Sequence, residues 1–176
     1  MYNAKPSHVV WIQGLTCNGN SHSFLNYEYL EHFTEHFKVL HHPQLPSLYS
    51  IEEILADEIV IDFLIIEGAL SHKKQILDRF DGTFNKTLER LQKRAKHIIC
   101  TGSCASYGGI FRLHDEENIT GALFAGKQKG GYWDKNDKVI NISGCPMHPK
   151  WLVETLFRLR ENKKIALDEF RRPREV

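Results

Sequence analysis

Four short apolar runs, separated by stretches with helical periodicity, constrain the fold of this 176-residue chain more than any other feature. They lie at residues 8–14, 60–68, 97–102 and 138–143, and a shorter strand is predicted at 37–43. A strand that is covered on both faces has few polar positions, and parallel strands need a long crossover between them. The alternation therefore predicts an α/β fold of flavodoxin-like type, with helices on both faces of a mostly parallel sheet.

The segments between the strands predict helices within a single domain that spans residues 1–176. Ser21 is the expected cap of the first helix, and Gly82 is expected to kink the third. Residues 110–137 carry four glycines and little periodicity, so a long loop is expected there. The polar stretch at 165–176 is predicted to be an exposed C-terminal tail. The helices themselves are predicted, from apolar residues spaced by three and four, at about 21–36, 51–58, 72–95 and 149–162.

The charge balance and the length of the apolar segments exclude several classes of partner. Lys and Arg number 23 against 22 Asp and Glu, so a net charge of +1 gives no reason to expect nucleic acid or an anionic membrane. The longest apolar run, at 59–70, is interrupted by Asp62 and Glu67 and is too short to span a bilayer. The N-terminus shows no secretory or twin-arginine signal, and we expect a cytoplasmic protein without membrane insertion.

The histidines and cysteines differ in what their positions imply. Most of the ten His sit singly, and the neighbours His41 and His42 would point to opposite faces of a strand. In a cytoplasmic setting the four Cys are expected to be buried thiols or metal ligands rather than disulfides. Cys100 lies inside an apolar strand, which favours core packing.

Cys17, Cys104 and Cys145 each follow a glycine that ends a predicted strand. Because the carboxyl ends of parallel strands meet at the same edge of a sheet, we expect these three thiols to converge there. Glycine-rich loops let backbone amides approach a bulky ligand, and amides can donate hydrogen bonds to sulfur. Any one of these cysteines alone could be a small buried side chain, but their shared edge favours a metal-cluster site.

Five segments of the sequence, taken in order, resemble the small subunit of nickel–iron hydrogenases. The first matches the family's opening strand and its C-x-x-C-S cluster loop. The others match the V-E-G-A/S strand end, the G-T-C-A-x-x-G-G loop, the V-I-N-I-P-G-C-P-P-H-P-x-W run and the L-D-x-x-G-R-P stretch of that family. In this chain the segments read VVWIQGLTCNGNSHSFL, IIEGAL, TGSCASYGGI, VINISGCPMHPKWLVETL and ALDEFRRPREV.

The resemblance implies a flavodoxin-like domain that holds the proximal four-iron, four-sulfur (4Fe-4S) cluster through Cys17, Cys104 and Cys145. In the family this cluster passes electrons between the nickel–iron centre of a separate large subunit and further clusters. The resemblance therefore implies an electron-transfer subunit of an oxidoreductase, with a large-subunit-like protein and a further electron carrier as partners. No catalytic residue and no bond-making step are expected in this chain itself.

Two departures from the family pattern leave the cofactor open. The second cysteine of the C-x-x-C pair falls on Asn20, so the cysteine set is incomplete. One iron of the cluster could bind water instead of a protein ligand. Alternatively, Asn20 or less readily His22 could bind it weakly. Cys100 could also take the place of the missing cysteine, although its position inside a strand argues against this. The chain also ends where the family's C-terminal domain would begin, so at most one cluster is expected.

The same departures motivate two alternatives to electron transfer. In one, the chain holds no cluster and uses the same surface to bind or assemble a hydrogenase large subunit, as a degenerate paralogue. In the other, the three thiolates bind zinc together with water or His22.

Two further polar residues lie beside the predicted site. Glu67 ends the second long buried strand, and its carboxylate is expected either near the cluster or a proton path, or bonded to loop amides. His148 is expected either to donate a hydrogen bond beside the cluster or to brace the last helix. Trp151 is expected in the core or at an interface.

Overall fold

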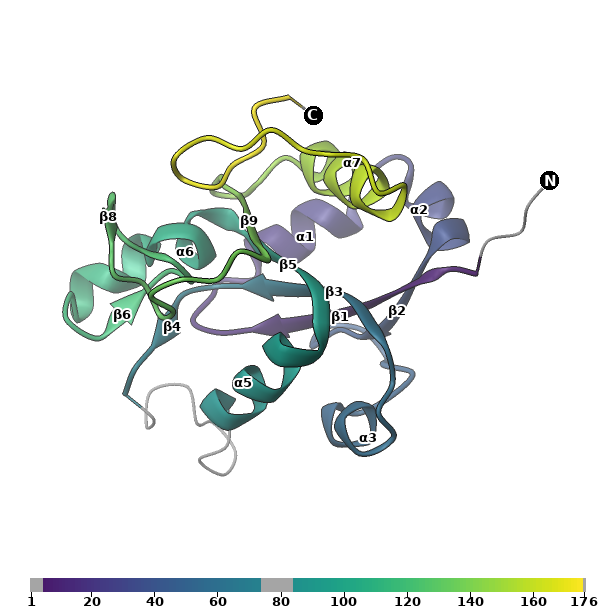
Figure 1. The fold of residues 1–176 in the computed structure, drawn as a ribbon, viewed down its shortest axis with the longest axis horizontal. Coiled ribbons are helices and arrows are strands. Elements are labelled where there is room, and N and C mark those ends of the chain that lie inside the picture. Colours follow the sequence, from purple (N-terminus) through teal and green to yellow (C-terminus); the bar gives the residue numbers. More distant parts are fainter. Residues whose placement is uncertain (1–4, 74–83, 176) are drawn as a thin grey trace.

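Five parallel strands form the central sheet of the computed structural model, which describes residues 5–73 and 84–175. Their order across the sheet is β2-β1-β3-β5-β9 (Figure 1), the strand order of flavodoxin-like folds. All five predicted strands are present, and the predicted α/β class is confirmed. The strands are β1 (Ser7–Gln13), β2 (Phe37–His41), β3 (Ile61–Glu67), β5 (Ala95–Thr101) and β9 (Val139–Ile142).

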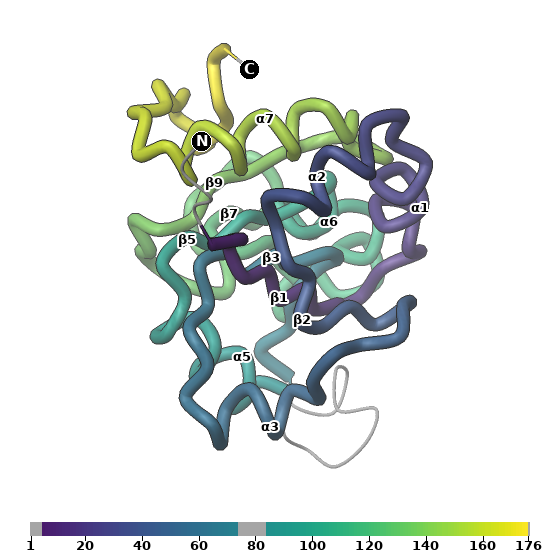
Figure 2. The backbone as a smooth tube through the Cα atoms, turned by 90° about the vertical axis from the view of Figure 1, so that its right-hand side faces the viewer, coloured from purple at the N-terminus to yellow at the C-terminus, as the bar shows by residue number. Residues whose placement is uncertain are grey.

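Helices cover both faces of this sheet, as the continuous apolar strands predict. Along β1, Val9 and Trp11 pack on one face while Val10 and Ile12 pack on the other, because successive side chains of a strand alternate. Figure 1 shows α1, α2 and α7 above the sheet and α3 and α5 below it, and Figure 2 shows the same layers from the side. These helices are α1 (Gly19–Leu25), α2 (Leu30–His36), α3 (Ile51–Ala56), α5 (Phe84–Arg94) and α7 (Pro149–Arg160).

The single helix predicted at 21–36 is wrong, because the chain forms two helices there. The Asn26 side-chain amide donates to the His22 carbonyl over 2.8 Å, and this bond closes the last turn of α1. A short amide side chain competes in this way with continuation of a helix. Ser21 is not a cap either, since α1 begins at Gly19 and the Ser21 hydroxyl is used elsewhere. Of the helix predicted at 72–95, Gly82 and the rest of 74–83 lie outside the described residues.

The segment predicted as a long loop, residues 110–137, contains short elements that pack onto the end of the sheet. A six-residue helix, α6, precedes it, and a 3₁₀ helix, η1, begins it. Ala122, Leu123 and Phe124 are buried in the core on the α5 side of the sheet, which explains why a stretch without periodicity is still ordered by packing. The elements of this segment are η1 (Gly109–His114), β6 (Ile119–Thr120), β7 (Phe124–Ala125) and β8 (Gln128–Lys129). The preceding helix is α6 (Gly102–Tyr107), and β6 pairs with β4 (Leu70–Ser71), which follows β3.

The C-terminal stretch, predicted to be an exposed tail, consists of exposed and half-buried residues and is hydrogen-bonded to the edge of the sheet. The Asn141 N–H donates to the Arg171 carbonyl over 2.9 Å, and the Asn141 side chain donates to the Phe170 carbonyl over 2.8 Å. The Phe170 ring contacts the rings of Tyr107 and Phe124. Because β9 is an edge strand with unpaired backbone groups, the returning chain supplies the partners that the sheet lacks there. Among the described residues, no helix is both long and apolar enough to cross a bilayer.

Candidate metal-cluster site

The three cysteines predicted to meet do lie in loops at one edge of the sheet. Cys17 follows β1, Cys104 lies on α6 directly after β5, and Cys145 follows β9. These strands are parallel, and β5 is paired with both β3 and β9, so their carboxyl ends lie side by side. All three thiols are free, with Cys17 and Cys145 exposed and Cys104 half-buried.

Hydrogen bonds tie the three cysteine loops to one another. The Ser103 N–H, next to Cys104, donates to the Gly144 carbonyl, next to Cys145, over 2.7 Å. The Met147 N–H donates to Asn20 Oδ1 over 2.9 Å, and the Ser23 hydroxyl donates to the Met147 carbonyl over 2.9 Å. The loops that carry the thiols are therefore held as one unit before any ligand binds.

The electrostatics of Cys104 reflect the closeness of the other two thiols. Burial raises the pKa of the Cys104 thiol, and the nearby Cys145 and Cys17 raise that pKa further. The backbone N–H of Ile110 donates to the Cys104 sulfur and acts in the opposite direction. The thiols repel one another as thiolates, so a cation between them would favour loss of their protons.

The three sulfurs of Cys17, Cys104 and Cys145 do not all lie within 4.8 Å of one another. Three thiolates on one tetrahedral zinc, with bonds of about 2.3 Å, would lie about 3.8 Å apart. Within residues 5–73 and 84–175, the one set of three Cys, His, Asp or Glu ligand atoms that all lie within 4.8 Å of one another is elsewhere, on α2. Zinc binding by the three thiolates would therefore need these side chains to move closer together.

Asn20, the first candidate for a fourth ligand, is used to brace the site. Its side chain is 7% exposed, and its carbonyl oxygen accepts the Met147 N–H. The amide also packs on Gly102, where a Cβ atom would lie 2.3 Å from Asn20 Nδ2. Gly102 has a φ of +84°, so glycine meets both the backbone and the packing requirement here. The amide at position 20 thus joins α1 to the loop after β9.

The other two candidate ligands lie away from this brace. His22 is exposed and lies about 200° around helix α1 from Asn20. Cys100 is completely buried inside β5, among the core residues on the α5 side of the sheet, and burial raises the pKa of its thiol. Cys100 is therefore part of the core, as its strand position indicates.

Glu67 is a fully buried carboxylate that organises the Cys17 loop. It stands at the end of β3, between the strands that lead to Cys17 and Cys104. The carboxylate accepts six hydrogen bonds, so the interpretation as a strand-end Glu bonded to loop amides is supported. The donors to Oε1 are the Thr16 hydroxyl at 3.2 Å and the N–H groups of Asn20 at 3.1 Å and Ser21 at 3.3 Å; the donors to Oε2 are Trp11 Nε1 at 3.2 Å, Gln13 Nε2 at 3.1 Å and the Ser21 hydroxyl at 2.5 Å.

The Glu67 network extends to His42, which the sequence did not single out as part of the site. His42 is 2% exposed, and burial lowers its pKa to about 4, so its ring is neutral near pH 7. Nδ1 accepts the Gln44 N–H over 3.1 Å, which places the ring proton on Nε2, 3.3 Å from the Ser21 hydroxyl. A chain of polar groups thus runs from His42 through Ser21 to Glu67.

His148 and Trp151 lie at the start of α7, next to the Cys145 loop. His148 is exposed, and its Nδ1 accepts the Lys150 N–H over 3.3 Å, so this side chain caps the helix. The Trp151 side chain is 49% exposed and lies outside the core. Across the Cys104 loop, Ile110 and Leu113 of η1 are 67% and 74% exposed. Large apolar side chains therefore lie at the surface in the neighbourhood of the cysteines.

Comparison with known proteins decides the family. Residues 17–159 match the model of the family described as NADH ubiquinone oxidoreductase, 20 kDa subunit. The chain belongs to this family. The match begins at Cys17 and includes Cys104 and Cys145, so all three site cysteines lie within the family region.

Relatives of this family member include hydrogenase small subunits, and the predicted resemblance is confirmed. The chain is 28% identical to the F420 non-reducing hydrogenase I small subunit of Methanosarcina mazei, over 94% of the chain and 53% of that protein. It is 29% identical to the periplasmic [NiFeSe] hydrogenase small subunit of Desulfomicrobium baculatum, over 87% of the chain and 54% of that protein. The chain thus spans about half the length of these curated relatives.

A solved hydrogenase shares the fold. The structure of a reduced, active Ni-Fe-Se hydrogenase from Desulfomicrobium baculatum superposes with a TM-score of 0.73 and 24% identity, covering 96% of this chain and 70% of that one. This agreement supports the flavodoxin-like fold described above.

Proposed function

We propose that this chain is the electron-transfer subunit of a nickel–iron hydrogenase-type oxidoreductase. In this proposal Cys17, Cys104 and Cys145 hold one iron–sulfur cluster of 4Fe-4S type. The observation that carries it is the set of three free thiols at one edge of the sheet, on loops that are hydrogen-bonded to one another. The small-subunit relatives support it independently.

The residues present fit such a cluster in the chemistry of their donor atoms. Thiolates are the preferred ligands of iron–sulfur clusters, and a bound cluster would supply reversible electron transfer. Cys17, Cys104 and Cys145 would supply three thiolates to such a cluster, and a fourth ligand would have to come from water or from an added thiol. The Ile110 N–H, already directed at the Cys104 sulfur, would tune the reduction potential of the site.

The chain's own polar groups would position the ligands rather than perform chemistry. Glu67 holds the loop before and after Cys17 through Thr16, Asn20 and Ser21. Asn20 holds the loop after Cys145. We therefore assign no catalytic residue to this chain and place bond-making steps in a partner.

The partner is proposed to be a large-subunit-like protein that docks beside the cysteines. Exposed Ile110, Leu113 and Trp151 offer apolar surface close to the site, as expected of a docking face. A second protein, an electron carrier, would exchange electrons with the cluster. A cytoplasmic location would keep the free thiols reduced, and localisation by cell fractionation tests it.

A second candidate function is a cluster-free protein that binds or assembles a hydrogenase large subunit. The role of Asn20 favours it, because the side chain at the usual fourth-ligand position is committed to a structural hydrogen bond. In this case the same docking face operates without iron.

Anaerobic reconstitution of the full chain with iron and sulfide distinguishes the two functions. We expect about three to four irons and as many sulfides per chain, with a broad visible absorption, if a four-iron cluster forms. Cys104→Ala removes a proposed ligand and should abolish this iron, whereas Cys100→Ala removes a core thiol and should leave it bound. A colourless chain without iron that still captures the large subunit would refute electron transfer and support the assembly function.

A further inference from the structure

A second cluster of potential metal ligands lies on α2, away from the cysteines. His32, Glu35 and His36 each offer one ligand atom, and these three atoms lie within 4.8 Å of one another. Across the part of the chain that the structure describes, this is the one such set of three. The sequence did not single out either histidine, but the helix brings them together.

Helix geometry explains the cluster. Residues three and four positions apart share one face of an α-helix, so His32 faces both Glu35 and His36 across one turn. His32 Nδ1 lies 3.3 Å from Glu35 Oε2. Two ligands of a tetrahedral ion with bonds of about 2.0 Å lie about 3.3 Å apart, so this pair is already at ligand spacing. The two imidazole ring centroids are 4.9 Å apart.

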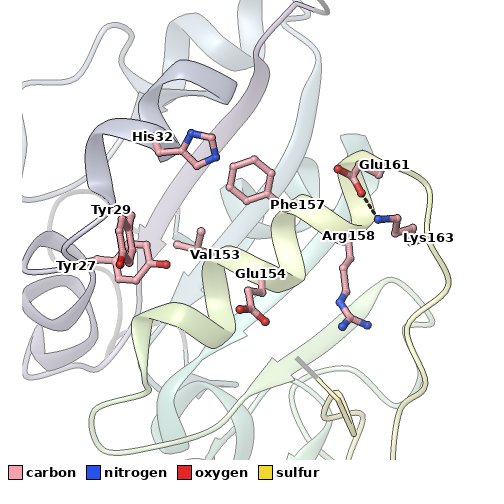
Figure 3. Close-up of a pocket in the computed structure, with 9 residues that line it drawn as sticks. All are labelled: Tyr27, Tyr29, His32, Val153, Glu154, Phe157, Arg158, Glu161 and Lys163. Carbon is pink, nitrogen blue, oxygen red and sulfur yellow. Dashed lines mark ion pairs between the residues drawn. The ribbon is translucent and has the colours of Figure 1, made fainter.

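One aromatic side chain from α7 holds both imidazoles. The Phe157 ring stacks on His32 with centroids 5.3 Å apart and meets His36 edge-on, also at 5.3 Å. Figure 3 shows His32 directed from α2 toward Phe157, beside a surface hollow of about 440 Å³ that Tyr27, Tyr29 and Val153 also line. The His32 and Glu35 side chains are 59% and 69% exposed, so a hydrated ion can reach them.

We propose that His32, Glu35 and His36 bind one divalent transition-metal ion of the zinc class. Imidazole nitrogens select such ions over calcium and magnesium, and two imidazoles with one carboxylate complete three positions. Water fills the remaining position, as in open sites with three protein ligands. A shared ion would join His36 to the ion pair that His32 already makes with Glu35.

This site is separate from the cysteine edge. His36 directly precedes β2, so the cluster lies at the amino end of the sheet, whereas the cysteines lie at its carboxyl end. A five-residue strand spans about 16 Å. A bound ion would stabilise the last turn of α2, where this helix meets β2 and α7. The cysteine thiols would not be ligands of this ion.

Zinc titration of the full chain by calorimetry tests the proposal, with His36→Asn compared against His114→Asn. His114 is an exposed histidine on η1, so its replacement changes the histidine count without touching the cluster. Any zinc taken up by the thiols is common to both variants. We expect His36→Asn to lose one zinc per chain, or to bind that zinc at least tenfold more weakly, while His114→Asn binds as the unaltered chain does.

Two further measurements locate the ion and guard against misfolding. Glu35→Gln, at the most exposed of the three positions, should weaken the same zinc several-fold while the circular dichroism spectrum stays unchanged. Zinc should also shift the ring nitrogen resonances of His32 and His36 in NMR spectra and leave those of His114 in place. Equal zinc stoichiometry and affinity in all variants, or shifts confined to other histidines, would overturn the proposal.

Discussion

Replacing Glu67 by Gln isolates the contribution of the buried carboxylate beside the Cys17 loop. Gln has nearly the same size and shape, so the change opens no cavity and alters only charge and hydrogen bonding. The six donors around Glu67 divide evenly between its two oxygens. Whichever oxygen becomes the amide nitrogen, that nitrogen meets two N–H groups that cannot turn into acceptors by rotation of a hydroxyl.

The expected loss of stability follows from this count. Leaving a buried donor unpaired costs about 1–3 kcal/mol. The new amide nitrogen leaves two donors unpaired at Oε1, and one or two at Oε2, where the Gln13 amide can turn over to present its oxygen. Removing a buried charge offsets part of this loss, because an ionised carboxylate is costly to desolvate. We therefore expect Glu67→Gln to lower the free energy of unfolding by about 2–4 kcal/mol, a large share of the roughly 5–15 kcal/mol typical of native proteins.

Urea unfolding of the full chain at pH 7, followed by circular dichroism, measures this difference. For a chain of this length a loss of about 3 kcal/mol corresponds to a fall in Tm of roughly 10 °C. Glu52→Gln, an exposed carboxylate on α3, is the control and should change stability by less than about 0.5 kcal/mol. If the free energy of unfolding of Glu67→Gln lies within about 1 kcal/mol of that of the unaltered chain, the six contacts do not stabilise the fold to this extent.

Three further changes test separate parts of the structure. Asn20→Cys adds a fourth thiol and should raise the amount of iron retained after gel filtration of the reconstituted chain. The change also removes the hydrogen bond to the Met147 N–H, which costs about 1–3 kcal/mol of stability. An unchanged iron content would contradict a cluster at this edge of the sheet. Burial lowers the pKa of His42 to about 4 from 6.5, so the unfolded chain binds the extra proton and stability should fall by up to about 3 kcal/mol as the pH drops from 6.5 to 4. In urea titrations, His42→Gln should make the free energy of unfolding less dependent on pH. If it depends on pH as steeply in that variant, other titratable groups cause the effect. Leu113→Asp should reduce co-purification of the large subunit at least fivefold with iron content unchanged. Val60→Asp should not, since Val60 is similarly exposed but lies directly before β3, at the other end of the sheet; equal effects of the two changes would show that η1 is not part of the docking face.

The strand pattern was predictable because it depends on burial alone. Each central strand is covered on both faces, so its apolar run is visible without knowledge of its neighbours, and β1 and β3 were placed to within one or two residues. The helix break at Asn26 was not predictable from periodicity, since the apolar spacing continues through it. Only the capping bond to His22 shows why the first helix stops there.

The candidate site also has features that the sequence predicts and features that it does not. That Cys17, Cys104 and Cys145 lie at one edge follows from the direction of parallel strands, which chain order and the apolar pattern already imply. The role of Asn20 does not follow, because a sequence comparison shows a missing ligand while the fold shows a hydrogen bond to Met147, 127 residues away. No local pattern encodes a contact between segments that distant.

By itself, the sequence determined the layers of this fold and the edge at which its thiols emerge, because burial and strand direction leave marks in the order of residues. The tertiary structure alone decided how the polar groups around those thiols are used. Glu67 gathers donors from β1 and α1, and the C-terminal stretch pairs with the free edge of β9. Phe157 on α7 holds the imidazoles of α2. Each of these is a contact between elements far apart in the chain, and such contacts exist only once the elements have packed.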